Sequence, residues 1–226
     1  MGTRNITRVI LDGEIKVNQY SQWDGYPTGR GNDVLLFMRD ILSSPGQKDE
    51  FIRRLRLSSL NMLNDGDQRN TTYTGAPIDA KDYDALERFD EYRYKKMKLA
   101  LDNGLETDYI TTAKSAVQEG EFTLEEMVTV FAASRDVGCY VLPFLMEFCP
   151  DGMALWTDEY SLNVPPEGDW QIQGVFTIDF DAQTVAISFN GDTSWSISFD
   201  ALASKTDKSI FREMVKLESR IRGEEE

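Results

Sequence analysis

Hydrophobic and polar residues alternate near both ends of the chain, which is the pattern of half-buried β-strands. At the N-terminal end, residues 6–11 and 14–20 flank Asp12-Gly13, a pair typical of a tight β-hairpin. At the C-terminal end, the alternation predicts an antiparallel meander with one apolar face. Its three strands cover residues 171–180, 184–189 and 194–199.

The middle of the chain instead repeats its apolar residues at helical spacing, which predicts a run of amphipathic helices. Asn32 is the expected N-cap of the first helix, and Thr123 with Glu126 matches a capping box. The strongly apolar segment 137–148 contains a glycine and a proline and reads as a buried helix with a break. The remaining predicted helices cover residues 49–63, 83–101 and 210–221.

Strands at both ends around a helical middle predict a single α+β domain over residues 1–226, with residues 223–226 as a frayed tail. We expect the N-terminal hairpin and the C-terminal antiparallel meander to lie in stacked or shared sheets covered by helices. The polar residues 64–80 show no periodicity and predict a flexible loop or lid.

Charge and composition narrow the functions that this chain can perform. The 226 residues carry a net charge of −15, and there is no histidine. Such acidity disfavours direct contact with nucleic acid or an anionic membrane; it either serves solubility or suits a basic protein partner. Without histidine, the usual general base, the Ser-His-Asp triad and nearly every zinc site are excluded. Only oxygen ligands remain for a metal, which would be magnesium, calcium or manganese. We expect no catalytic residue, no cofactor and no metal, and an enzyme is less favoured than a binding protein.

Cys139 and Cys149 are the only cysteines. The N-terminal residues lack an apolar signal-peptide region, and no apolar run reaches the length of a membrane helix. These features predict a cytoplasmic protein whose two cysteines are reduced core residues rather than a disulfide.

The densest candidate site is the segment Gln-Trp-Asp-Gly-Tyr-Pro-Thr-Gly-Arg-Gly at residues 22–31, here called the Trp23 loop. As a binding loop, it would hold an anion on backbone amides and on a guanidinium, with an aromatic side chain stacked on the ligand. As a structural corner, it would bury its tryptophan and use its glycines to turn the chain. The candidate ligand-binding residues are Trp23, Asp24, Tyr26, Arg30 and Gly31.

Other charged groups have two readings each. Asp179 and Asp181 share one strand face, where they could bind a divalent cation or share a proton. Alternatively, Asp181 belongs to the turn and Asp179 is solvated. Arg135-Asp136 borders the most apolar helix as an internal tie or a site. The basic clusters are solvated helix faces or contacts for an acidic partner; they comprise Arg53, Arg54, Arg56, Lys95, Lys96 and Lys98.

The start Gly2 to Asn5 followed by the Trp23 loop resembles a family of uncharacterised proteins found in phages, bacteria and some fungi. Residues 134–138 and 176–181 are also similar to that family. The resemblance implies a phage-encoded protein acting in the host cytoplasm, and it brings no assigned activity.

The layout also resembles the N-terminal nucleophile hydrolases. In those enzymes the first residue is Cys, Ser or Thr and its free amine is the base, so that no histidine is needed. The resemblance implies Thr3 as nucleophile, which requires removal of both Met1 and Gly2.

Three hypotheses follow from the sequence. The first is a non-enzymatic binding protein that engages a host protein or sequesters a small anionic ligand. The second is a structural or assembly protein that forms a homo-oligomer. The third is a divergent amide hydrolase that uses Thr3.

Overall fold

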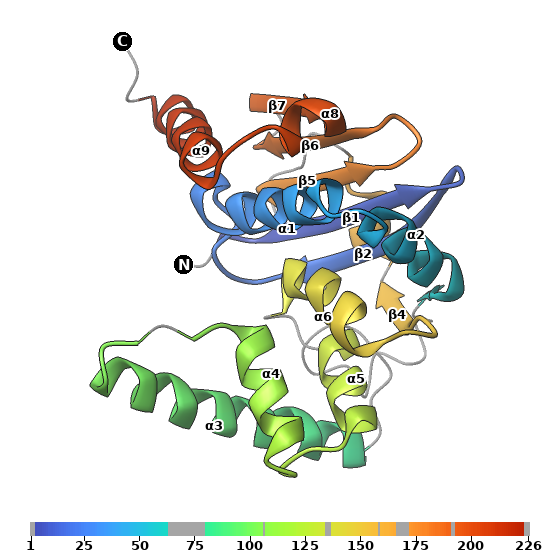
Figure 1. The fold of residues 1–226 in the computed structure, drawn as a ribbon, viewed down its shortest axis with the longest axis vertical. Coiled ribbons are helices and arrows are strands. Elements are labelled where there is room, and N and C mark those ends of the chain that lie inside the picture. Colours follow the sequence, from blue (N-terminus) through green and yellow to red (C-terminus); the bar gives the residue numbers. More distant parts are fainter. Residues whose placement is uncertain are drawn as a thin grey trace.

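The computed structural model describes residues 3–62, 80–105, 107–133, 137–157, 159–165, 172–190 and 193–223. Within these ranges the chain folds into a mixed five-stranded sheet with helices packed around it (Figure 1). The fold is α+β, as the sequence predicts. Loop 64–80 and the pair Arg135-Asp136 fall outside the described residues, except for Ala80.

The N-terminal hairpin and the C-terminal meander share one sheet, in the strand order β2-β1-β5-β6-β7. The central strand β1 runs antiparallel to β2 and parallel to β5, with Asn5 opposite Gly174 and Val9 opposite Ile178. Of the two arrangements left open by the sequence, the shared sheet is the one formed. The strands are β1 (Asn5–Leu11), β2 (Glu14–Ser21), β5 (Gly174–Asp179), β6 (Thr184–Phe189) and β7 (Thr193–Ser198).

The predicted hairpin turn is confirmed, since Asp12 and Gly13 have φ values of 56° and 74°. The Asp181 carboxylate accepts hydrogen bonds from both amides, at 2.9 and 2.7 Å. Asp179 in turn accepts from the amide of Asp181 at 2.9 Å and from that of Ala182 at 2.8 Å. Asp181 therefore belongs to a turn, as one interpretation of the sequence has it, whereas Asp179 is not simply solvated but caps the turn after β5.

One face of the sheet packs on α1 (Asn32–Ser43) and α2 (Gln47–Leu57) (Figure 1). Val34, Leu35 and Met38 of α1 are fully buried, in the same core as Phe176 and Ile187 of the sheet. The short α8 (Phe199–Ala203) and the C-terminal α9 (Asp207–Arg222) pack beside α1.

Two details of the predicted helices are wrong. The helix expected over residues 49–63 ends at Leu57, because the chain leaves it at Ser58 to form β3 (Ser59–Met62). This strand pairs in parallel with β4 (Ala154–Thr157), so Met62 is an exposed strand residue. Asn32 is not an N-cap, because the chain is already helical in the preceding turn, η1 (Pro27–Gly31).

A second group of helices lies below the sheet in Figure 1. It contains α3 (Ala80–Asp102), α4 (Tyr109–Gln118) and α5 (Leu124–Ala133). The turn η3 (Gly138–Tyr140) and α6 (Val141–Phe148) connect this group to the sheet, so the broken apolar helix is confirmed. The capping box of Thr123 and Glu126 is also confirmed by its reciprocal hydrogen bonds.

The opposite face of the sheet is partly covered, because α7 (Glu159–Asn163) and β4 lie near β2. Arg8 points into this side and is buried. Its guanidinium donates to Asn18 Oδ1 at 2.9 Å and to the main-chain oxygen of Val164 at 3.1 Å. Burial lowers the pKa of Arg8. Arg8 also donates to the main-chain oxygens of Ser161 and Leu162 in α7, so a buried polar network ties α7 to the hairpin.

Both cysteines are free and buried, as the sequence predicts. Among the described helices, none is long and apolar enough to cross a membrane.

Candidate functional site

The Trp23 loop is held to β1 by one buried side chain. Asn5 Nδ2 donates to the main-chain oxygen of Trp23 at 3.1 Å and to that of Ser21 at 3.4 Å. The amide of Gly25 donates to the main-chain oxygen of Thr3 at 3.1 Å. A Cβ at Gly25 would lie 2.8 Å from Asn5 Cβ, so glycine is required at this close approach. Residues 3–5 and the Trp23 loop, which belong to the two motifs that carry the family resemblance, therefore contact each other.

The second half of the loop folds back on itself as the turn η1. The amide of Arg30 donates to the main-chain oxygen of Asp24 at 3.0 Å, and the amides of Gly29 and Gly31 donate to that of Tyr26. A side chain at Gly29 would collide with the Asp24 carboxylate, 2.3 Å away. These contacts fix Asp24 and Arg30 next to each other.

The five candidate residues point to two different places. Tyr26 stacks on Phe189 with a ring separation of 5.8 Å, and Gly31 packs against Ile187. These two residues join the loop to the sheet. Asp24 and Arg30 instead line a cavity on the other side. Trp23 is 52% exposed, so it is not a core residue.

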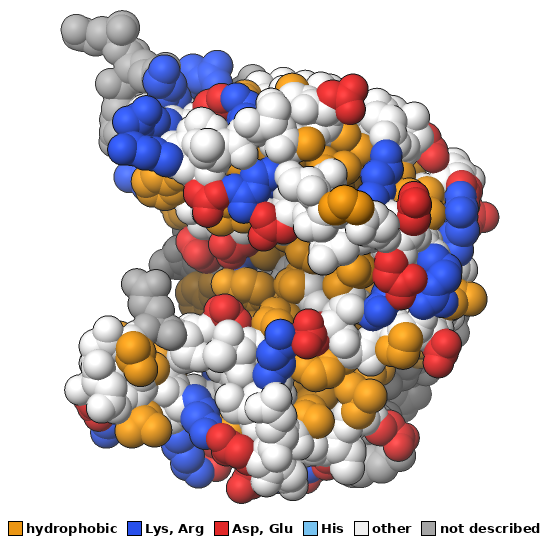
Figure 2. Space-filling model, viewed as in Figure 1, with side chains coloured by type: hydrophobic (Ala, Val, Ile, Leu, Met, Phe, Trp, Pro, Cys, Tyr) orange, Lys and Arg blue, Asp and Glu red, His pale blue; other side chains and the backbone are white. Residues whose placement is uncertain are grey.

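The cavity has a volume of about 180 Å³. Its residues come from the Trp23 loop, η3, α3, α4 and the segment before α4. Figure 2 shows the molecule hollowed between the sheet above and the α3–α4 group below, and the cavity residues come from both sides of that hollow. They are Asp24, Arg30, Arg93, Met97, Thr107, Asp108, Tyr109, Thr112 and Tyr140.

A continuous series of ring contacts crosses the cavity wall. The Arg30 guanidinium lies 4.3 Å from the ring centroid of Tyr140, which stacks on Tyr109 at 5.2 Å. The Arg93 guanidinium lies 4.5 Å from the ring centroid of Tyr109. Two arginines distant in the sequence are thus held on one pair of stacked tyrosines, in geometry that favours cation–π attraction.

Acidic groups surround Arg30. Asp33 Oδ2 lies 3.4 Å from Arg30 Nη1. Burial raises the pKa of Asp33, outweighing the opposing attraction of Arg30. Burial lowers the pKa of Arg30, but attraction to Asp33 and to the ionised forms of Cys139 and Tyr140 opposes it, and the pKa lies above the ordinary value, so Arg30 stays cationic.

Arg93 is the more available of the two guanidinium groups. Its Nε is buried and has no hydrogen-bond partner among the described residues, and its Nη2 is 3.8 Å from Asp90. A buried donor without a partner is costly, so this nitrogen is a site of stored instability in the cavity wall.

The Asp108 carboxylate already has a structural role. Asp108 is the N-cap of α4, and its carboxylate accepts from the amide of Thr111 at 2.7 Å. Asp24 also lines the cavity, and it is exposed to solvent. The cavity therefore combines two guanidinium groups with two carboxylates, of which Asp24 is exposed and Asp108 is used as a helix cap.

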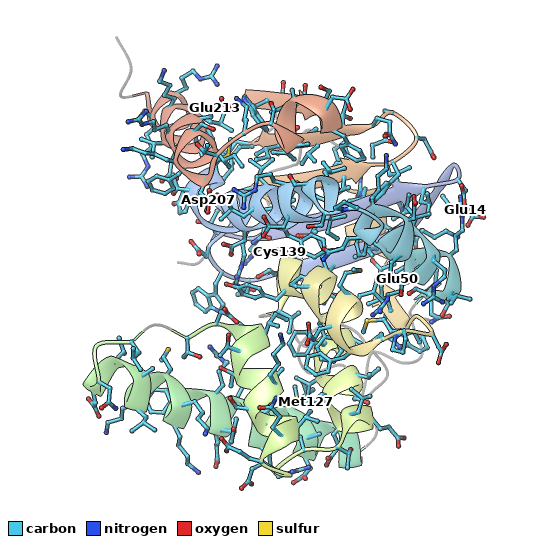
Figure 3. The ribbon with its side chains drawn as sticks, viewed as in Figure 1. Glu14, Glu50, Met127, Cys139, Asp207 and Glu213 are labelled. Carbon is cyan, nitrogen blue, oxygen red and sulfur yellow. The ribbon has the colours of Figure 1, made fainter. Side chains whose placement is uncertain are left out.

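The candidate nucleophiles are poorly placed for chemistry. Cys139 lies between the sheet and α6, near the centre of the molecule (Figure 3), and burial raises its pKa to about 12. Thr3 is buried, and its main-chain oxygen is bonded to the Trp23 loop. Among the described residues, no three acidic or cysteine side chains gather as a metal site would require.

Sequence reasoning found Asp24 and Arg30 but not Arg93, Tyr109 or Tyr140. These three lie in helical segments whose local pattern is that of ordinary amphipathic helices. Their convergence depends on how α3, α4 and η3 pack, and no local signal in the sequence reports it.

Comparison with protein-family models, with curated proteins and with solved structures finds no match for this chain. The functional argument therefore rests on the geometry of the cavity.

Proposed function

We propose that this protein is a non-enzymatic binding protein that holds a small anionic ligand in the cavity between the Trp23 loop and α3–α4. The observation that carries the proposal is the convergence of Arg30 and Arg93 on one cavity. Charge-assisted hydrogen bonds from guanidinium groups are among the strongest ligand contacts that a protein makes.

The size of the cavity limits the ligand. At about 30 Å³ per water molecule, a volume of about 180 Å³ corresponds to about six waters. A carboxylate or phosphate with a short side group fits this space, whereas a dinucleotide does not. Tyr109 and Tyr140 offer an apolar wall to such a side group.

Calorimetric titration with acetate, inorganic phosphate and N-acetyl-leucine tests this proposal. We expect saturable binding of at least one of these anions, and about tenfold or greater weakening in Arg93→Gln, because a charge-assisted bond is lost. Arg88→Gln is the matched control, since Arg88 lies on the same helix and also stacks on an aromatic ring, Phe122, outside the cavity. The proposal fails if the wild type binds none of the anions or if Arg93→Gln binds them equally well.

The two other hypotheses from the sequence, an assembly protein and a hydrolase that uses Thr3, stay as predictions. An assembly protein would form a defined oligomer, and a Thr3 hydrolase would lose Met1 and Gly2. Intact mass and sedimentation measurements on the untagged protein test both.

A further inference from the structure

The outer side of α9 is basic and apolar, although the chain as a whole carries a net charge of −15. The inner side fixes the helix to the molecule, since Ile210, Met214 and Leu217 are buried there. Eight residues of α9 are exposed, and five of these are Lys or Arg while one is acidic. They are Asp207, Lys208, Phe211, Arg212, Val215, Lys216, Arg220 and Arg222. In Figure 2, basic side chains gather over this helix.

The exposed residues of α9 form two rows that run side by side along the helix. Residues four apart are neighbours on a helix surface. Phe211 and Val215 have this spacing and form an apolar row, with 50% and 42% of their area exposed. The second row, here called the basic row, consists of Lys208, Arg212, Lys216 and Arg220.

The acidic residues of α9 are engaged by the body of the protein. Asp207 forms an ion pair with Arg39 of α1, and Glu218 is buried. Glu213 lines a surface hollow together with residues of both rows, but it is paired with Lys205. Figure 3 labels Asp207 and Glu213, which lie on the side of α9 that faces the rest of the molecule. The two rows therefore contain no acidic residue.

The basic row has little internal compensation. Lys208, Arg212 and Lys216 form no ion pair with any described residue. Residues 224–226, which follow the helix and are glutamates, lie outside the described part of the chain. Like charges four residues apart on a helix destabilise it. Carboxylates of a partner along the row would relieve this repulsion.

The surroundings of α9 select the class of partner. With 16 residues the helix is about 24 Å long, whereas charges more than about 10 Å apart are largely screened at about 0.1 M salt. A segment that lies along α9 is therefore attracted by the basic row more than it is repelled by distant acids. A bilayer or a DNA duplex would extend onto Asp40 and Asp207, which border the helix at Arg39. A symmetric pair of α9 helices would oppose cations to cations.

We infer that the outer side of α9 binds an acidic amphipathic helix of a protein partner. The carboxylates of that helix pair with the basic row, and its apolar side chains cover Phe211 and Val215. No residue of α9 lines the cavity that holds Arg30 and Arg93. This surface is therefore a second site, and the inference does not depend on the proposed anion site.

The test is selection of a displayed library of random peptides, each as long as α9, on the immobilised full-length protein. We expect enriched peptides that place Asp or Glu beside apolar residues at helical spacing. An enriched peptide, synthesised and titrated by fluorescence anisotropy, should bind Arg212→Glu and Phe211→Ser about tenfold or more weakly than the wild type. Its binding to the wild type should also weaken as salt is raised.

Matched controls come from α3, which lies at the other end of the molecule (Figure 1). Lys98→Glu makes the same change of charge sign at an exposed position, and Leu99→Ser makes the same change of polarity at a residue that is 59% exposed. Both should bind the peptide as the wild type does. Urea midpoints verify that each variant is folded, and Lys216→Glu repeats the charge test at the next position of the basic row.

Three results would overturn the inference. The first is that no peptide is enriched, and the second is that the enriched peptides lack acidic residues. The third is that Arg212→Glu and Lys98→Glu bind an enriched peptide equally well. Vesicles that contain phosphatidylserine and a DNA duplex are titrated beside the peptide. If either binds in an Arg212-dependent manner while no peptide is enriched, the surface belongs to that partner instead.

Discussion

The side-chain amide of Asn5 donates to the main-chain oxygen of Trp23 across 3.1 Å, and this contact joins the start of β1 to the loop that forms one wall of the cavity. Asn5 is fully buried, so its amide bonds are protected from water. The position of Asp24 and Arg30 therefore depends on a residue that does not line the cavity.

Replacing Asn5 with alanine should destabilise the protein by about 1–3 kcal/mol, because three main-chain oxygens lose a buried donor. Urea denaturation measures this change. Asn103→Ala is the control, since the Asn103 amide makes an exposed bond within its own helix end. Equal effects of the two substitutions would show that Asn5 does not anchor the loop.

Arg30 and Tyr140 should be energetically coupled. A double-mutant cycle of Arg30→Gln and Tyr140→Leu is expected to give a coupling of about 1 kcal/mol, the usual range for a cation–π pair. Thermal or urea unfolding of the four variants provides the free energies. Additive effects of the two substitutions would contradict the contact.

More of the fold than of the candidate site could be predicted from the sequence. The hairpin followed from Asp12-Gly13 because turn chemistry is local, and the meander followed from a clean alternation. The β3–β4 pair was missed because Met62 continues the apolar stripe of the helix before it. Whether residues 59–62 form a helix or a strand is settled by pairing with β4, almost a hundred residues away.

The same limit applies to the cavity. Arg30 stood out because it lies among glycines and aromatics, whereas Arg93 lies on a long helix among many charges and resembles a solvated residue. Its role depends on the distance between its guanidinium and Tyr109, a contact between two helices. Pairwise contacts of this kind follow from tertiary packing and not from local pattern.

Cys139 should be inert in the folded protein. Burial raises its pKa to about 12, and that of Cys149 to about 11, so the thiolate fraction of both is very small at about pH 8. An Ellman assay should show no rapid reaction without denaturant and reaction of two thiols in urea. Rapid modification of the native protein would contradict the burial of these thiols.

Acid should remove one stabilising contact on α2. Hydrogen bonds from Arg53 and Arg54 lower the pKa of Glu50 to about 2, from an ordinary value of 4.5. Because the folded pKa is depressed, this contribution to stability is present above pH 4.5 and is lost as the pH falls through about 2. Glu50→Gln should therefore unfold at lower urea than the wild type near pH 6, and the difference should shrink towards about pH 2.

The control for this prediction is Glu91→Gln. Glu91 is exposed, and its ion pair with Lys95 is long, at 3.8 Å. It should leave the urea midpoint nearly unchanged across the range. A pH-independent difference for Glu50→Gln would mean that the two arginine bonds do not favour the ionised carboxylate.

The central claim is that Arg30 and Arg93 bind an anion together, and nitrogen NMR of the arginine Nε–Hε groups during titration with N-acetyl-leucine tests it most directly. The account predicts saturable shifts of the Arg30 and Arg93 signals with one shared dissociation constant, and no shift of Arg88. Unchanged signals for Arg30 and Arg93 with each of acetate, inorganic phosphate and N-acetyl-leucine, or a linear drift shared by all three arginines, would contradict it.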